Sequence, residues 1–141
     1  MRKVKILLAV FLIGVVFGMV ACGAAGPALE DTIWVMESYG EQGELQAVLA
    51  DTEITAEFRS ADGTVAGSSG CNSYSGGYEI NEDNLTVKPP IISTMMACLE
   101  PVMEQEQKYF SLLESAETFQ IQNGNLSISS SGNQVMVFTA Q

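Results

Sequence analysis

Hydrophobic and polar residues alternate along much of the chain, which is the period of a β-strand that buries one face. The alternation is clearest from Ile54 to Arg59, where apolar side chains are separated by polar or charged ones. Turn sequences such as Asp62-Gly63 and Asn123-Gly124 separate segments of this kind and favour tight hairpins. The pattern predicts strands at residues 32–38, 52–59, 64–69, 74–80, 85–87, 118–122, 126–129 and 134–139.

Prolines and one helical period interrupt this series. Because proline cannot donate a hydrogen bond to a sheet, we expect Pro89 and Pro90 to end the strand at 85–87. Residues 101–115 place apolar side chains at helical spacing, with Pro101 at the first helical position. Consecutive hairpins with one helix predict an α+β (mainly β) fold, an antiparallel curled sheet of about seven to eight strands closed by one helix.

The N-terminal segment has the plan of a secretory signal peptide. Three of the six basic residues lie in the first five positions, and an apolar run at 6–20 follows. This run is shorter than the roughly 20 residues that a membrane-spanning helix needs. It ends in Met19-Val20-Ala21-Cys22, which resembles the bacterial lipobox. That resemblance implies a lipid on the thiol of Cys22 and cleavage directly before it.

This interpretation divides the chain into a lipoprotein signal peptide at 1–21, a tether at 22–30 and a domain at 31–141. Because two or more acyl chains hold a protein stably on a membrane, we expect Cys22 to anchor the domain on the extracytoplasmic side of the cell envelope. Two alternatives stay open. Ordinary cleavage near Ala24 would release a soluble protein, and an uncleaved leader could serve as a helical anchor.

The part of the chain after the leader is strongly acidic. Its three basic side chains, Arg59, Lys88 and Lys108, stand against seventeen acids and give a net charge of −14. Such a charge repels the phosphates of nucleic acid, so no nucleic-acid partner is expected. The acids are spread along the chain, which favours a role in solubility over cation binding.

Two cysteines, Cys71 and Cys98, lie within the domain. Export to an oxidising compartment predicts a disulfide between them. It would close a loop of 26 intervening residues, which stabilises a fold by roughly 3–4 kcal/mol. Two free buried thiols are the alternative. A metal site is less favoured, because the chain has no His and no Cys-x-x-Cys spacing, and no cofactor is expected.

The order of these motifs resembles that of the META domain, also called the HslJ-like family, over about residues 30–141. The residues that carry the resemblance are Trp34, Ser38, Gly40, Gly67, Gly70, Cys71, Asn72, Gly76, Tyr78, Leu85, Thr94, Met95, Met96, Ala97, Cys98, Glu106, Phe110, Leu113, Leu126 and Phe138. The resemblance implies a compact antiparallel β domain with one helix, often lipidated and located in the cell envelope. It also implies a link to heat and antibiotic stress, without assigned catalytic residues.

Candidate chemistry in the sequence is sparse. Without His, a serine or thiol nucleophile lacks its commonest base. Glu79, Glu82 and Asp83 could supply the paired carboxylates of a hydrolase, although a solvated turn is the simpler interpretation. Asn72 and Thr94 are expected to hydrogen-bond the backbone beside the disulfide rather than bind a substrate.

The methionines are the other candidate feature. Met95, Met96 and Met103, together with Met36 and Met136, could line an apolar groove for a lipid tail or a peptide, although core packing is the simpler interpretation. The sequence therefore predicts a non-enzymatic envelope lipoprotein that binds or scaffolds an envelope partner during stress. The alternatives are a carrier that holds a lipid or apolar peptide in a methionine-lined cavity, and a carboxylate-dependent hydrolase.

Overall fold

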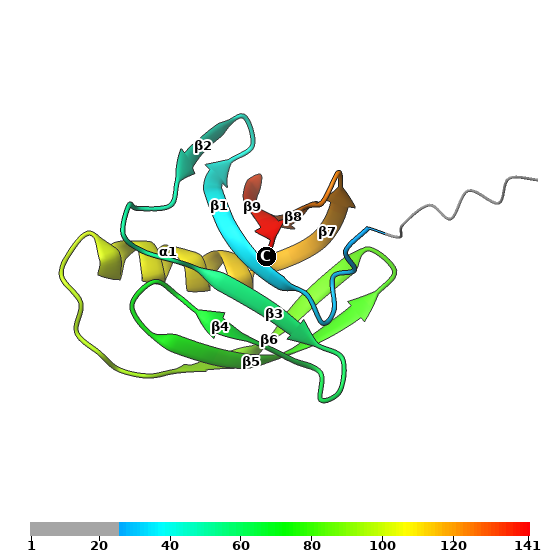
Figure 1. Cartoon of the computed structure of the whole chain (residues 1–141), viewed down its shortest axis with the longest axis horizontal. Helices are drawn as coiled ribbons and strands as arrows, with labels where there is room; N and C mark the ends of the chain where they lie inside the picture. The colour runs from blue at the N-terminus through cyan, green and yellow to red at the C-terminus, as the bar shows by residue number, and fades with distance from the viewer. Residues whose placement is uncertain (1–25) are drawn as a thin grey trace, which may run out of the picture.

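Eight antiparallel strands close into a barrel, because the first strand pairs along one edge with the last (Figure 1). The computed structural model describes residues 26–141, so the expected signal peptide and Cys22 lie outside the described residues. Around the barrel the order is β1, β3, β4, β5, β6, β7, β8 and β9. The bounds are β1 Ile33–Glu41, β2 Glu44–Ala47, β3 Thr55–Arg59, β4 Thr64–Ser68, β5 Ser73–Asn81, β6 Asn84–Ser93, α1 Val102–Glu114, β7 Ala116–Gln122, β8 Asn125–Ser130 and β9 Gln134–Ala140.

This arrangement confirms the predicted mainly-β fold with one helix. The sequence pattern missed β2, which pairs only with the second half of β1 and projects from the barrel (Figure 1). All four residues of β2 are exposed. A strand without a buried face has no alternating hydrophobic pattern, so the period that located the others was absent here.

The prediction that Pro89 and Pro90 end the preceding strand is wrong, because β6 continues to Ser93. The pairing of β5 with β6 shifts register between Ser75 and Gly77, which leaves both prolines inside a bulge. A bulged residue needs no ladder hydrogen bond, so proline is tolerated there. The extra residues of this bulge lie on β6, opposite Gly76 of β5.

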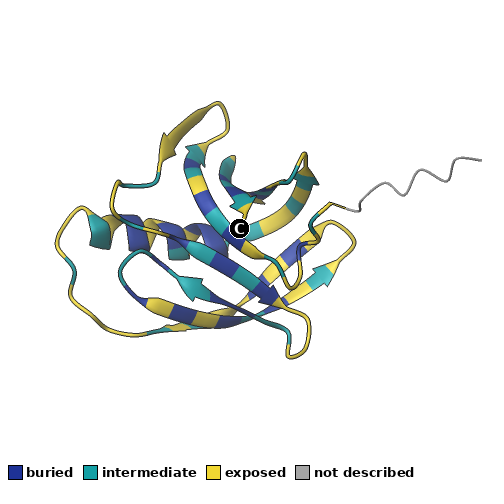
Figure 2. Ribbon diagram, viewed as in Figure 1, coloured by how far each residue is buried: buried dark blue, intermediate teal, exposed yellow. Residues whose placement is uncertain are grey.

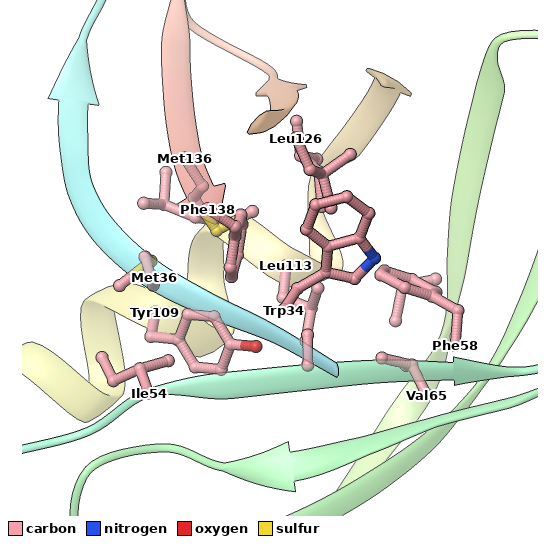
Figure 3. Packing of buried hydrophobic residues seen from close by; sticks show 14 of the residues in the cluster. Trp34, Met36, Ile54, Phe58, Val65, Tyr109, Leu113, Leu126, Met136 and Phe138 are labelled. Atoms are coloured by element: carbon pink, nitrogen blue, oxygen red, sulfur yellow. The ribbon is translucent and has the colours of Figure 1, made fainter. Parts of the chain in front are cut away.

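The barrel interior is filled with large side chains, and buried and exposed residues alternate along the strands (Figure 2). Trp34, Phe58 and Phe138 meet at the centre of the core, where Tyr109 and Leu113 reach them from the helix (Figure 3). Among residues 26–141 the large apolar side chains that are fully buried are Trp34, Ile54, Phe58, Val65, Leu85, Tyr109, Leu113, Leu126, Ile128, Met136 and Phe138. One continuous core therefore joins the strands and the helix.

Helix α1 packs against β6 and β9 and lies in the sequence between β6 and β7. These two strands share one residue pair, Asn84 with Thr118, and α1 connects them in the sequence. The helix begins at Val102, one residue later than the sequence indicated, and Pro101 is its N-cap residue. Among residues 26–141 no helix has the length and apolar character needed to cross a bilayer.

The domain begins earlier than the predicted tether boundary. Leu29 is buried in the core, and its carbonyl oxygen accepts a hydrogen bond of 2.9 Å from Nε1 of Trp34. Glu30 accepts a hydrogen bond of 2.6 Å from the Tyr78 hydroxyl. Both residues were assigned to the tether at 22–30, and the structure places them on the barrel instead. The indole N–H of a buried tryptophan needs an acceptor, and the backbone of Leu29 supplies it.

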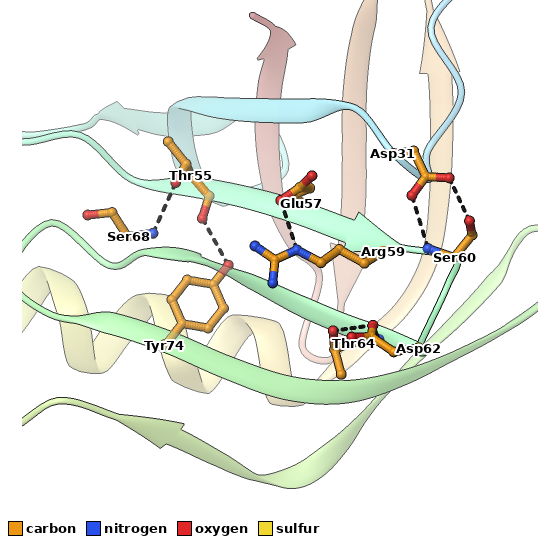
Figure 4. Close-up of polar contacts among 9 residues, drawn as sticks. All are labelled: Asp31, Thr55, Glu57, Arg59, Ser60, Asp62, Thr64, Ser68 and Tyr74. Carbon is orange, nitrogen blue, oxygen red and sulfur yellow. Dashed lines mark hydrogen bonds and ion pairs between the residues drawn. The ribbon is translucent and has the colours of Figure 1, made fainter.

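Gly67 allows β3 and β4 to approach closely. A Cβ atom at this position would lie 2.1 Å from the carbonyl oxygen of Thr55. The same oxygen accepts a hydrogen bond of 2.9 Å from the Tyr74 hydroxyl (Figure 4). The Thr55 carbonyl belongs to the backbone, so it cannot rotate away from an added Cβ as a side chain could.

Replacing Gly67 with alanine should therefore lower the free energy of unfolding by about 2 kcal/mol, because the strands must separate. The measurement is urea denaturation of the purified domain. Gly77→Ala is the matched control, since its Cβ would meet Lys88 Cβ at an ordinary contact distance of 3.6 Å. Equal stability of the two variants would show that the close approach is not required.

Candidate binding site at the loop between β6 and α1

The loop at 94–101 is fixed to the barrel by a covalent bond. Cys98 in this loop forms a disulfide with Cys71, which lies between β4 and β5, with Cα atoms 6.1 Å apart. The sequence led to the same pairing. The bond prevents the loop from moving away from the barrel as a free segment.

Asn72 attaches the same loop through its side-chain amide. Its Oδ1 atom accepts hydrogen bonds from Thr94 Oγ1 at 2.9 Å and from the backbone N–H of Met96 at 2.7 Å. Thr94 Oγ1 lies 3.2 Å from the Ser73 backbone N–H, which donates to it. These contacts hold backbone in place, which is the role that the sequence suggested for Asn72 and Thr94.

A buried carboxylate lies beneath Asn72. Glu106 of α1 is only 5% exposed, and its carboxylate accepts hydrogen bonds from the Asn72 backbone N–H at 3.0 Å and from Asn72 Nδ2 at 2.9 Å. Ser69 Oγ donates a further short hydrogen bond to it. Within residues 26–141 the ion pairs are Arg59–Glu57 and Lys88–Glu79, so no basic side chain neutralises Glu106.

Sequence reasoning placed Glu106 near the start of the helix and in the family pattern but did not propose it as a site residue. Its position in the sequence could have indicated burial. Glu106 lies three residues before Tyr109 and seven before Leu113, and this spacing places all three on the buried face of α1. Gln105 occupies a similar position. It accepts a hydrogen bond from the Leu49 N–H at 2.8 Å and donates one to Thr52 Oγ1 at 3.0 Å.

Four large apolar side chains gather on and beside this loop, and we call them the methionine surface: Ile92, Met95, Met96 and Leu99. Their exposed fractions are 71%, 96%, 58% and 85%, in that order. Other exposed large apolar residues, Ile33 and Leu45, are less than half exposed. Because scattered apolar residues are normal on a surface, the concentration of the most exposed ones in eight positions is the informative observation.

A shallow hollow of about 310 Å³ opens beside the methionine surface. Glu106 and Asn72 line it together with Met95, Met96 and Met103. Ser93, Thr94 and Ala97 complete its lining. Three of the five methionines that the sequence assigned to an apolar groove are therefore brought together, around a hollow that Asn72 and Glu106 also line.

The remaining methionines and motif residues lie elsewhere. Met36 and Met136 are buried in the barrel core (Figure 3), and neither lines the hollow. Trp34 and Tyr78 are also core residues. Gly70 has a φ of +93°, a conformation that glycine adopts without strain, and it leads the chain into Cys71.

The opposite end of β3, β4 and β5 receives the N-terminal segment. Asp31 accepts hydrogen bonds from the backbone N–H of Ser60 at 3.1 Å and from its hydroxyl at 2.6 Å (Figure 4). These hydrogen bonds lower the pKa of the Asp31 carboxyl below its usual value. In Figure 1 the chain enters on one side of the molecule, and the loop between β6 and α1 lies on the other.

The acids proposed for hydrolase chemistry do not converge on one hollow. Glu79 pairs with Lys88, and Glu82 occupies the turn between β5 and β6. Asp83 lines a broader hollow against β7, β8 and β9 as its one acidic residue. In the described part of the chain no group of three potential metal ligands is close enough to hold an ion.

A family model described as "META domain" matches residues 27–141. Three solved structures share the fold. An NMR structure of a protein from Burkholderia xenovorans is 24% identical, with a TM-score of 0.67 over 80% of this chain and 83% of that one. A second NMR structure is 23% identical, with a TM-score of 0.61 over 79% of this chain and 90% of that one.

The third is a crystal structure of a DUF4847 family protein from Bacteroides vulgatus, 13% identical, with a TM-score of 0.58 over 79% of this chain and 93% of that one. At these identities the structural similarity concerns the fold alone. No curated protein sequence matches the chain significantly.

Proposed function

The chain belongs to the META domain family, and we propose that it is a membrane-anchored lipoprotein of the cell envelope that binds a partner without catalysing a reaction. In this proposal Cys22 carries the lipid, and the domain acts on the extracytoplasmic side during heat, antibiotic or other envelope stress. The observation that carries the binding role is the methionine surface, which is exposed to solvent yet held in a fixed position.

The way this surface is held supports a binding role. The disulfide and Asn72 attach the loop to the barrel at two points. A rigid apolar surface loses little conformational entropy when a partner covers it, whereas a mobile loop would have to be ordered first. Apolar side chains that serve only the fold would be buried, and Met95 and Leu99 are not.

The position of the anchor supports the same proposal. Leu29 is the first buried residue in the described part of the chain, and it lies seven positions after Cys22. A chain of that length spans at most about 25 Å. The barrel would therefore lie close to the bilayer with its N-terminal side toward the lipid, and the methionine surface would face away from it.

A carrier function is the second candidate, and the same hollow is the feature that favours it. The barrel interior is occupied by Trp34, Phe58 and Phe138, so a lipid tail would have to bind in the hollow at the surface. Native mass spectrometry of the purified protein separates the two functions. A co-purified lipid would support the carrier, and its absence would favour partner binding.

Labelling with radioactive palmitate tests the anchor. We expect the wild-type protein to incorporate the label and to remain in the membrane fraction, because acyl chains on Cys22 partition into the bilayer. Cys22→Ala should lose the label. Cys71→Ser is the matched control, since it removes a cysteine that carries no lipid in this proposal. Equal labelling of wild type and Cys22→Ala would contradict the anchor.

A photo-reactive amino acid placed at single positions tests the binding surface in the cell. At Met95 we expect a specific cross-link to an envelope protein. At Gln122, an exposed residue at the end of β7, we expect none. Cross-links of equal strength at both positions would argue against a defined binding surface.

A further inference from the structure

Building on the proposed binding role, we propose that the hollow receives a lysine or arginine side chain of a partner protein, while apolar residues of the same segment cover the methionine surface. Two neighbouring features of the structure support this proposal, and the fold does not require them to be neighbours. One is a buried carboxylate without a basic partner, and the other is an apolar surface beside it.

The carboxylate of Glu106 is satisfied by hydrogen bonds but not by charge. Asn72 and Ser69 supply its donors, and no lysine or arginine of the described residues pairs with it. Oε1 accepts one hydrogen bond, from Asn72 Nδ2, and a carboxylate oxygen can accept more than one. A cation that enters the hollow would therefore meet a negative charge in partly desolvated surroundings, where attraction is stronger than in water.

The walls of the hollow suit a long basic side chain. Met95, Met96 and Met103 offer flexible thioether side chains, which adapt to apolar groups of varied shape. Lysine and arginine have apolar stems that pack on such surfaces and carry the charge at the tip. A hollow of about 310 Å³ has room for one long side chain but not for a larger part of a partner protein.

Charge and position identify a basic protein segment as the occupant. With a net charge of −14 after the leader, the domain attracts basic molecules over a distance. Glu100, in the loop, and Glu104, in the first turn of α1, are exposed and add to this attraction. Because the methionine surface lies on the side away from the N-terminal entry, the membrane that holds the anchor is not the expected occupant (Figure 1).

The test uses a capped synthetic peptide of alternating leucine and lysine, and a matched peptide with glutamine in place of lysine. We expect the lysine peptide to bind the wild-type domain at least about tenfold more tightly by calorimetry, since a charged hydrogen bond replaces a neutral one. With ¹³C-methyl methionine in the protein, the NMR signals of Met95, Met96 and Met103 should shift. The buried Met36 and Met136 serve as internal controls.

Two variants distinguish binding of lysine in the hollow from non-specific electrostatic attraction to the acidic domain. Glu106→Gln should reduce the preference for lysine to less than about threefold, whereas Glu114→Gln removes an exposed acid from the other end of the same helix and should keep it. Equal affinity for both peptides in the wild-type domain, or the same preference in Glu106→Gln, would overturn the inference. If Glu106→Gln does not fold, the methyl signals of the wild-type domain decide, and shifts outside the three methionines overturn it.

Vesicles of neutral phosphatidylcholine provide the last comparison. We expect no shift of the Met95 and Met96 methyl signals with vesicles. A shift would point to a lipid surface and overturn the proposal of a protein partner. Failure of the peptide test would leave the anchor and the cellular cross-link at Met95 untouched. The inference and the proposed function can therefore fail separately.

Discussion

Asn72→Ala is expected to lower the free energy of unfolding by about 3–4 kcal/mol, one of the largest effects of any single substitution in the domain. The side chain of Asn72 contacts both the loop backbone and the buried carboxylate. Its removal leaves the Met96 N–H without its acceptor and takes away donors from Glu106. Because this carboxylate has no basic partner, it depends on hydrogen bonds alone.

The measurement is urea denaturation under oxidising conditions, so that the disulfide stays intact. Asn84→Ala is the matched control. Asn84 is exposed, and its Nδ2 donates one hydrogen bond to the Asn81 carbonyl oxygen at 3.0 Å. Its loss should cost about 0.5 kcal/mol or less. If Asn72→Ala is as stable as the control, the loop and the carboxylate do not depend on Asn72.

Removal of the disulfide is the second large effect. The bond joins residues 27 positions apart in the sequence. In the chain-entropy model, closing a loop of this length stabilises the folded state by about 3.5 kcal/mol, because the unfolded chain loses conformations. Cys71→Ser should therefore unfold at lower temperature than wild type under oxidising conditions, and Cys98→Ser should behave in the same way.

Reductant provides the control for this prediction. Treatment with dithiothreitol should bring the wild-type protein down to the stability of Cys71→Ser, and it should leave the variant unchanged. A wild-type melting temperature that does not respond to reductant would contradict a disulfide that stabilises the domain, and would favour the two free thiols that the sequence also allowed.

The strands and helix were predictable where one face is buried. The alternation from Ile54 to Arg59 reports the burial of Ile54, Ala56 and Phe58, which is a local property of the sequence. Strand β2 has no buried residue, and β6 contains two prolines because they lie in a bulge of its pairing with β5. Both features depend on a neighbouring strand, so the local pattern could not indicate them.

The candidate site was predictable only in part for the same reason. The motif around Asn72 and Thr94 indicated backbone hydrogen bonds beside a disulfide, and the structure shows these contacts. The environment of Glu106 depends on Ser69 and Asn72, more than thirty positions earlier in the chain. The exposure of Met95 and Met96 could not be inferred from residue type, because methionine also packs in protein cores, as Met36 and Met136 do here.

Mass spectrometry of the full-length protein extracted from membranes is the decisive experiment for a lipid-anchored domain with an internal disulfide. We expect Cys22 to be the first residue and to carry acyl chains, and we expect one peptide pair to be joined through Cys71 and Cys98 in a non-reducing digest. An intact leader on a protein with both of these thiols free to react with an alkylating reagent would contradict it.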